Sequence, residues 1–197
     1  MSLTHLLYLH GFRSSPQSAK ARLMAQHMAQ HYPQVVWHCP QLPPSPQEAM
    51  QQVQAATAAW PARTMGVVGS SLGGFYATWV AEQRGCRAVL VNPAVDPARD
   101  LARYIGLQQH WHAPEESFYF APHYVDELRA LACGPLQQPQ RYLALIAQGD
   151  EVLDWREMQA RYSDCQLRVQ PGGDHALSNF ADYLALVCAH LLGTAAN

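Results

Sequence analysis

The chain has 197 residues, of which 49% are apolar and 14% are charged, and its formal net charge is −2. This length suits one domain with a hydrophobic core and is short for two. The balance of apolar and charged residues excludes a disordered chain. Because Lys and Arg form no cluster along the sequence, nothing points to nucleic-acid binding.

Neither a secretory signal nor a membrane span is predicted. Residues 1–10 lack the positively charged start and the small-residue cleavage site of a signal peptide. No apolar run approaches the roughly 18 residues that a span requires. The five cysteines form no C-x-x-C pair, so neither a zinc site nor a redox pair is indicated. Unpaired thiols favour a reducing, cytoplasmic location.

Short apolar segments alternate with helix-length segments. In chain order, the predicted elements are strand 6–9, helix 18–31, strand 35–37, helix 47–60, strand 65–68, helix 74–84, strand 88–91, strand 142–147, helix 155–162, strand 166–169 and helix 179–192. Strands that are apolar throughout and separated by helices are typical of a parallel sheet covered on both faces. We therefore predict one α/β domain over residues 1–197, with a doubly wound, mostly parallel sheet of about six strands.

The alternation breaks over residues 96–140. This segment shows no clean strand and is rich in aromatic residues, histidine and proline. Long insertions between strands are usually functional lids or disordered segments, and the aromatic content favours an ordered one. We predict an inserted helical lid; a longer helical crossover is the alternative.

The stretch Gly69-Ser70-Ser71-Leu72-Gly73 reads G-x-S-x-G. A predicted strand leads into it and a predicted helix leads out, which is the setting of the nucleophile elbow of α/β-hydrolases. A side chain at 69 or 73 would collide with the neighbouring strand or helix. Ser71 is therefore the candidate nucleophile. The alternative is an ordinary Gly/Ser turn.

A serine nucleophile needs a base and an acid that orients the base. In this fold the acid and then the base follow the serine along the chain, on loops after late strands. His175 follows the strand 166–169 and Asp150 follows the strand 142–147, each after a glycine. We predict His175 as the base and Asp150 as the acid.

Asp154 is the alternative to Asp150 as the acid. Asp154 comes four residues later, where its other role would be to cap the next helix. Glu151 is expected to face solvent. Asp174 precedes His175 directly, and because adjacent side chains usually point apart, we interpret it as a loop residue.

An acyl-transfer site also needs donors for the developing oxyanion. One is expected to be the backbone N–H of Leu72, at the start of the elbow helix. The other is expected from the loop after the first strand, where Gly11 permits a close approach and Phe12 carries the candidate N–H. For His10, a role in shaping this loop is favoured over a role as base or metal ligand.

Two further groups are weaker candidates. His110, His112 and His123 match no zinc signature and are interpreted as lid residues. The segment 13–15, Arg-Ser-Ser, either meets a polar group of the substrate or forms a solvated turn. No metal or organic cofactor is predicted.

Taken together, these segments resemble the YqiA-like esterases of bacteria, a family of single-domain α/β-hydrolases. The matching segments are 7–12 with 14–16, 40–44, 66–74, 91–95, 149–154 and 172–176. The family usually has Asn before the His, where this chain has Asp174. The resemblance implies a cytoplasmic carboxylesterase, with thioester cleavage of acyl-CoA also reported for the family, and it says least about residues 96–140.

The main hypothesis is a serine esterase or thioesterase that acts on a small-molecule acyl ester or thioester. Ser71 would attack the carbonyl, His175 would move the proton and Asp150 would orient His175. A hydrolase fold used only for binding, with an idle triad, is the non-enzymatic alternative. Acyl transfer to a nucleophile other than water is a third possibility.

Overall fold

The computed structural model describes residues 3–194, which form a six-stranded parallel sheet in the order β2-β1-β3-β4-β7-β8. The strands are β1 (His5–Leu9), β2 (Val36–His38), β3 (Met65–Ser70), β4 (Arg87–Val91), β7 (Tyr142–Ala147) and β8 (Gln166–Gln170). The predicted parallel sheet of six strands is confirmed.

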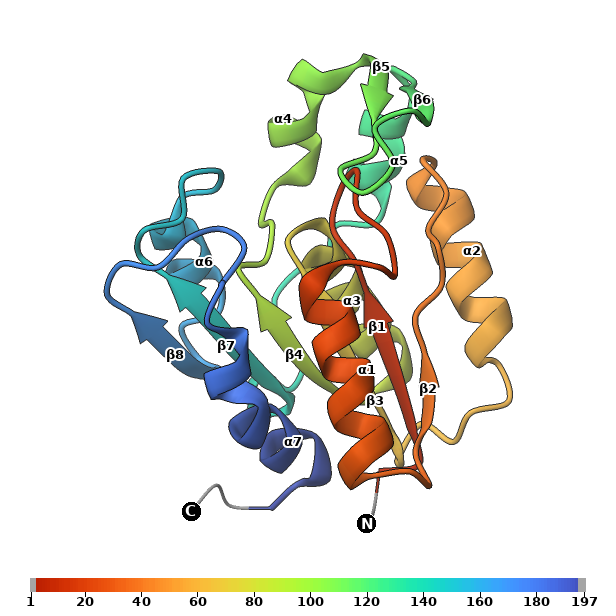
Figure 1. Ribbon diagram of the computed structural model, residues 1–197. Coiled ribbons are helices and arrows are strands. Elements are labelled where there is room, and N and C mark those ends of the chain that lie inside the picture. The colour runs from red at the N-terminus through yellow and green to blue at the C-terminus, as the bar shows by residue number, and fades with distance from the viewer. Residues whose placement is uncertain (1–2, 195–197) are drawn as a thin grey trace.

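Helices cover both faces of the sheet. They are α1 (Ala19–His31), α2 (Pro46–Thr57), α3 (Leu72–Arg84), α4 (Pro97–Leu101), α5 (Tyr124–Ala130), α6 (Trp155–Arg161) and α7 (Leu184–Leu192). Short 3-10 turns occur at Ala102–Tyr104, Pro139–Arg141 and Phe180–Tyr183. The helices α1 and α7 lie on one face of the sheet (Figure 1), where their apolar side chains share one core with Leu6 and Tyr8.

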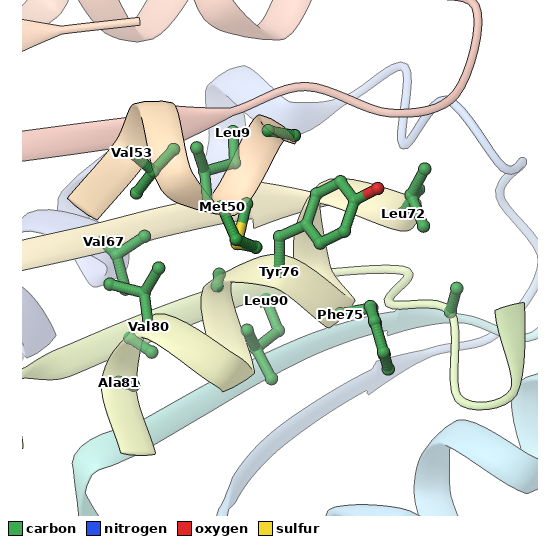
Figure 2. Packing of buried hydrophobic residues seen from close by; sticks show 14 of the residues in the cluster. Leu9, Met50, Val53, Val67, Leu72, Phe75, Tyr76, Val80, Ala81 and Leu90 are labelled. Atoms are coloured by element: carbon green, nitrogen blue, oxygen red, sulfur yellow. The ribbon is translucent and has the colours of Figure 1, made fainter. Parts of the chain in front are cut away.

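The opposite face packs against α2 and α3. Leu7 and Leu9 point into this second core, because successive strand residues alternate between faces. Figure 2 shows Tyr76 of α3 beside Met50 of α2. Burial on both faces is why the strands are apolar throughout.

Helix boundaries follow local capping rules. Ser45 accepts a hydrogen bond from the backbone N–H of Glu48 at 3.1 Å and so caps α2, whose first residue is Pro46. The helix α3 ends at Gly85, in the left-handed conformation with φ 66°.

The segment between β4 and β7 differs from the prediction. It contains α4 and α5, but also an antiparallel hairpin of β5 (Gly106–Gln109) and β6 (Ser117–Phe120), so the expectation of no strand there is wrong. These strands have only four residues each, and Leu107 and Tyr119 are 72% and 60% exposed. Such short, half-exposed strands form through pairing and packing, which an apolar pattern does not reveal.

The inserted segment lies at the carboxyl end of the sheet (Figure 1). Its hairpin is joined to the loop after β1: the Trp111 N–H donates to the Arg13 carbonyl at 2.8 Å, and Arg13 Nε donates to the Gln109 carbonyl at 2.6 Å. The Arg13 guanidinium also lies 4.0 Å from the Trp111 ring centroid. The insertion therefore covers the carboxyl ends of the strands, where the loops that follow the strands meet. Within residues 3–194, none of the helices has the length and apolar character needed to cross a bilayer.

Candidate active site

Ser71 lies at the sharp turn between β3 and α3. Its backbone has φ 57° and ψ −122°, a conformation that costs free energy for a residue with a side chain. Its N–H donates to the Val91 carbonyl and its carbonyl accepts from the Ala94 N–H, both at 3.0 Å. These bonds to the last residue of β4 and to the loop after it hold the strained turn in place.

The two glycines of the turn are required by close contacts. A Cβ at Gly69 would lie 2.0 Å from the Gly73 carbonyl oxygen, and a Cβ at Gly73 would lie 1.9 Å from the Leu9 carbonyl oxygen. Both collisions match the expectation from the sequence. Only glycine at both positions lets α3 begin this close to β1 and β3.

The structure brings Ser71, His175 and Asp150 together from three loops. His175 Nε2 lies 3.0 Å from Ser71 Oγ, and His175 Nδ1 lies 2.7 Å from Asp150 Oδ2. The Asp150 side chain is fully buried, whereas that of His175 is 20% exposed. The three groups form one hydrogen-bonded chain that ends at a hydroxyl.

Among the acids considered, Asp150 is the one whose carboxylate contacts the His175 ring. Its other oxygen, Oδ1, accepts from the backbone N–H groups of Val152 and Leu153, each at 2.8 Å, which compensates the burial of the carboxylate. Asp154 caps α6 by accepting from the Arg156 N–H at 2.9 Å.

Asp174 also points elsewhere. It accepts from the Ser178 N–H at 2.9 Å and from the Ser178 hydroxyl at 2.6 Å, and these bonds lower the pKa of Asp174. Its interpretation as a loop residue agrees with these contacts.

Two residues that hold the His175 loop were missed in the sequence. Asn92, fully buried after β4, donates from Nδ2 to the carbonyls of Asp174 and His175, both at 3.0 Å. Its Oδ1 accepts from the Ala147 N–H at 2.8 Å. Glu151 is exposed, as expected, yet its Oε2 accepts from the His175 N–H at 3.0 Å. The signals for Asn92 are its place directly after a buried strand and its inclusion in the segment 91–95 that resembles the family.

The two expected oxyanion donors lie in segments adjacent to Ser71. Leu72 is the first residue of α3, and within residues 3–194 neither its N–H nor that of Phe12 has a backbone partner. A Cβ on Gly11 would lie 3.2 Å from Ser71 Cβ, so the loop after β1 passes directly over the serine.

His10 fixes the shape of that loop. Its Nε2 accepts from the Leu42 N–H at 3.2 Å, so Nδ1 carries the proton and donates to the Gly11 carbonyl at 3.0 Å. Burial lowers the pKa of His10 to about 4, so the ring is neutral. These contacts agree with the predicted role in shaping the loop.

A pocket of about 360 Å³ opens beside Ser71 and His175. Its apolar lining comes from the loop after β1, the start of α3, α4 with the turn after it, and the loop after β7. It includes Phe12, Leu72, Leu101, Tyr104 and Leu153. Phe12 packs against Phe118 and Phe120 of the hairpin, with ring centroids 5.8 and 5.3 Å apart. The insertion therefore shapes one wall of the pocket.

Other groups of interest lie apart from this pocket. The His110 ring packs at a tilt against Phe118 with ring centroids 4.9 Å apart, and His123 lies 3.8 Å from Glu127. Among the side chains of residues 3–194, no three His, Cys, Asp or Glu gather as a metal site would require. Another pocket, of about 410 Å³, lies at the amino ends of the strands, near Met65, Arg87 and Arg141.

The fold is that of the α/β-hydrolases. A candidate hydrolase of Agrobacterium vitis S4 matches at 18% identity and TM-score 0.77, over 96% of this chain and 88% of that one. Est1E of Butyrivibrio proteoclasticus, with ferulic acid bound, matches at 13% identity and TM-score 0.71, over 98% and 88%. A structure from work on the metagenome-derived lipolytic enzymes LipS and LipT matches at 17% identity and TM-score 0.70, over 96% of this chain and 94% of that one.

Residues 5–191 match the uncharacterised protein family UPF0227. The chain therefore belongs to this family, the YqiA-like family that its motifs resemble.

Proposed function

We propose that the protein is a serine hydrolase that cleaves carboxylic esters or acyl thioesters through Ser71, His175 and Asp150. The observation that carries this proposal is the continuous hydrogen-bonded chain from Asp150 Oδ2 through the imidazole to Ser71 Oγ. A neutral imidazole whose Nδ1–H is held by a carboxylate presents Nε2 as the base, which is what a serine hydroxyl needs.

In the first half of the reaction, Ser71 Oγ attacks the acyl carbonyl carbon while His175 Nε2 takes its proton. The carbonyl oxygen becomes an oxyanion, which accepts hydrogen bonds from the Phe12 and Leu72 N–H groups. As the intermediate collapses, the bond to the leaving oxygen or sulfur breaks. His175 gives its proton to that atom, and the acyl group stays on Ser71.

In the second half, water attacks the acyl-enzyme. His175 takes a proton from the water, the same two N–H groups hold the oxyanion, and the proton returns to Ser71 Oγ as the acid leaves. Asp150 holds the imidazole in its tautomer and stabilises the imidazolium without becoming protonated. Water is the only co-reactant, and the steps require neither a metal nor an organic cofactor.

The apolar pocket of about 360 Å³ is the proposed acyl site, and its size fits a small molecule. Esterases and lipolytic enzymes among the fold neighbours support the same class. We also place the protein in the cytoplasm, because its five cysteines are free thiols.

Hydrolysis of p-nitrophenyl butyrate by wild type and Ser71→Ala tests this function. We expect the variant to lose at least 10³-fold in kcat, on the order of the loss when a triad member is removed, with an unchanged far-UV circular dichroism spectrum. Turnover that survives in the folded variant would refute the mechanism. No turnover by wild type of esters or thioesters would favour a binding protein, and ester products formed with added alcohols would favour an acyltransferase.

A further inference from the structure

A second, smaller pocket of about 140 Å³ reaches Ser71 from the side of α1. Its lining carries hydroxyl and ammonium groups, from Tyr8, Ser14, Ser18, Lys20 and Ser70. Ser71 and His175 line it as well. We refer to it as the Lys20 pocket.

Tyr8 contributes a buried hydroxyl that forms no hydrogen bond within the described residues. The side chain is 0% exposed, and its oxygen has no hydrogen-bond partner within residues 3–194. Burial raises the pKa of Tyr8, so the group stays a neutral O–H that can donate. Leaving a buried hydroxyl unpaired costs free energy, and the Tyr8 side chain is part of the wall of this pocket, so a ligand that displaces the wall slightly would give the hydroxyl a partner.

Lys20 is the only lysine of the chain. It is half-buried, and its Nζ donates to the Ala176 carbonyl. Within residues 3–194 no carboxylate lies within 4.0 Å of this ammonium. Burial lowers the pKa of Lys20 to about 8, against the opposing influence of Asp174 and Asp150, so the group is mostly charged at neutral pH. An ammonium has three donors, and the Ala176 carbonyl uses one of them.

We propose that the Lys20 pocket binds a carboxylate on the alcohol part of the substrate, so that the protein cleaves acyl esters of small hydroxy acids. This inference rests on the proposed function. Ser71 and His175 line both pockets, so the two parts of one ester can occupy them at the same time. The alcohol part, whose leaving oxygen His175 protonates, takes the Lys20 pocket. The acyl part then occupies the larger apolar pocket.

Charge and size define the ligand. A carboxylate accepts charge-assisted hydrogen bonds from the free donors of Lys20 and from the Tyr8 hydroxyl. The pocket volume of about 140 Å³ leaves room for a short alcohol such as glycolate. For O-butyrylglycolate, the ester bond to the glycolate oxygen breaks, water supplies the hydroxyl of butyrate, and glycolate leaves with the proton from His175.

The test compares O-butyrylglycolate with its neutral amide analogue, carbamoylmethyl butyrate, which has the same acyl group. Hydrolysis is followed by titrating the released acid at constant pH. We expect Lys20→Met to lower the ratio of the two kcat/KM values about 10- to 100-fold, the range for a hydrogen bond to a charged group. Lys20→Arg should restore part of that ratio, and Tyr8→Phe should lower it several-fold.

Arg22→Met is the matched control, because Arg22 is an exposed cation on the same helix. Its ratio should equal that of wild type. A ratio unchanged in Lys20→Met would overturn the proposal, even if both rates fell, because equal losses would mean that Lys20 only supports the His175 loop through Ala176.

A measurement without turnover separates this inference from the proposed function. In Ser71→Ala, acetylation of Lys20 by an amine-reactive ester is quantified by mass spectrometry of its peptide. We expect O-butyrylglycolate to protect Lys20 and carbamoylmethyl butyrate not to. Protection would support the pocket even if wild type hydrolysed neither ester, whereas equal labelling with both esters would overturn the inference.

Discussion

Asn92 holds the loop that carries His175. Its side chain, buried beyond β4, donates to the carbonyls of Asp174 and His175 and accepts from the Ala147 N–H, so it joins the ends of β4 and β7 to the loop after β8. No other described side chain makes hydrogen bonds to both Asp174 and His175 backbone carbonyls. The imidazole is thereby positioned from its backbone as well as from Asp150.

The first prediction concerns this positioning. We expect Asn92→Ala to lower kcat for an ester about 10- to 100-fold with a much smaller change in KM, because His175 loses its fixed position and a 1 Å displacement can cost about 10²-fold. Urea unfolding should show a loss of about 3 kcal/mol, from three hydrogen bonds of about 1 kcal/mol each.

Asn92→Gly separates two causes of that loss. Asn92 has φ 41°, a region that glycine enters without strain, so the glycine variant loses the hydrogen bonds but not the backbone fit. It should be more stable than Asn92→Ala and equally poor in kcat. Wild-type kcat in both variants would show that Asn92 has no part in positioning His175.

The sequence predicted the sheet and most of the site because both depend on local patterns. Strands buried on both faces are apolar runs, and Asp150 and His175 follow such runs after a glycine. The roles of Asn92 and Glu151 were not predictable, because their partners lie 83 and 24 positions away and are brought near only by the fold. The hairpin was missed because its four-residue strands gain their stability from pairing and from contacts with Phe12.

The second prediction concerns the acid. Asp150→Asn should lower kcat by roughly 10⁴-fold, because the amide no longer favours the tautomer in which Nε2 accepts the serine proton. Asp154→Asn should leave kcat within about threefold, since Asn is as good a helix cap as Asp. Steady-state kinetics of the two variants on p-nitrophenyl butyrate show which aspartate acts as the acid. A large loss of kcat in Asp154→Asn with a small loss in Asp150→Asn would reverse the assignment.

The third prediction concerns the acyl pocket. Leu101 ends α4, is 9% exposed and lines the pocket, so Leu101→Ala should enlarge it. We expect the preference among p-nitrophenyl esters of two to eight carbons to move to longer chains. Each further methylene that becomes buried should raise kcat/KM by the equivalent of about 1 kcal/mol of binding free energy, which would account for the shift.

Leu107→Ala is the control for this pocket. Leu107 lies in the same insertion but is 72% exposed, on the hairpin strand β5. Its chain-length profile should match that of wild type. An unchanged profile in Leu101→Ala would mean that the acyl group does not bind against α4.

The last prediction concerns stability in acid. Burial lowers the pKa of His10 from 6.5 to about 4, so the unfolded chain binds a proton at this residue before the folded protein does. As pH falls from about 6.5 to about 4, this difference should remove about 3 kcal/mol from the free energy of unfolding, and above pH 6.5 it should have no effect. In His10→Gln, which has no proton to bind, urea unfolding should give lower stability at pH 7 but a shallower decline between pH 6.5 and 4. Parallel declines in the two proteins would show that the neutral His10 ring, and with it the fixed loop over Ser71, does not govern this pH range.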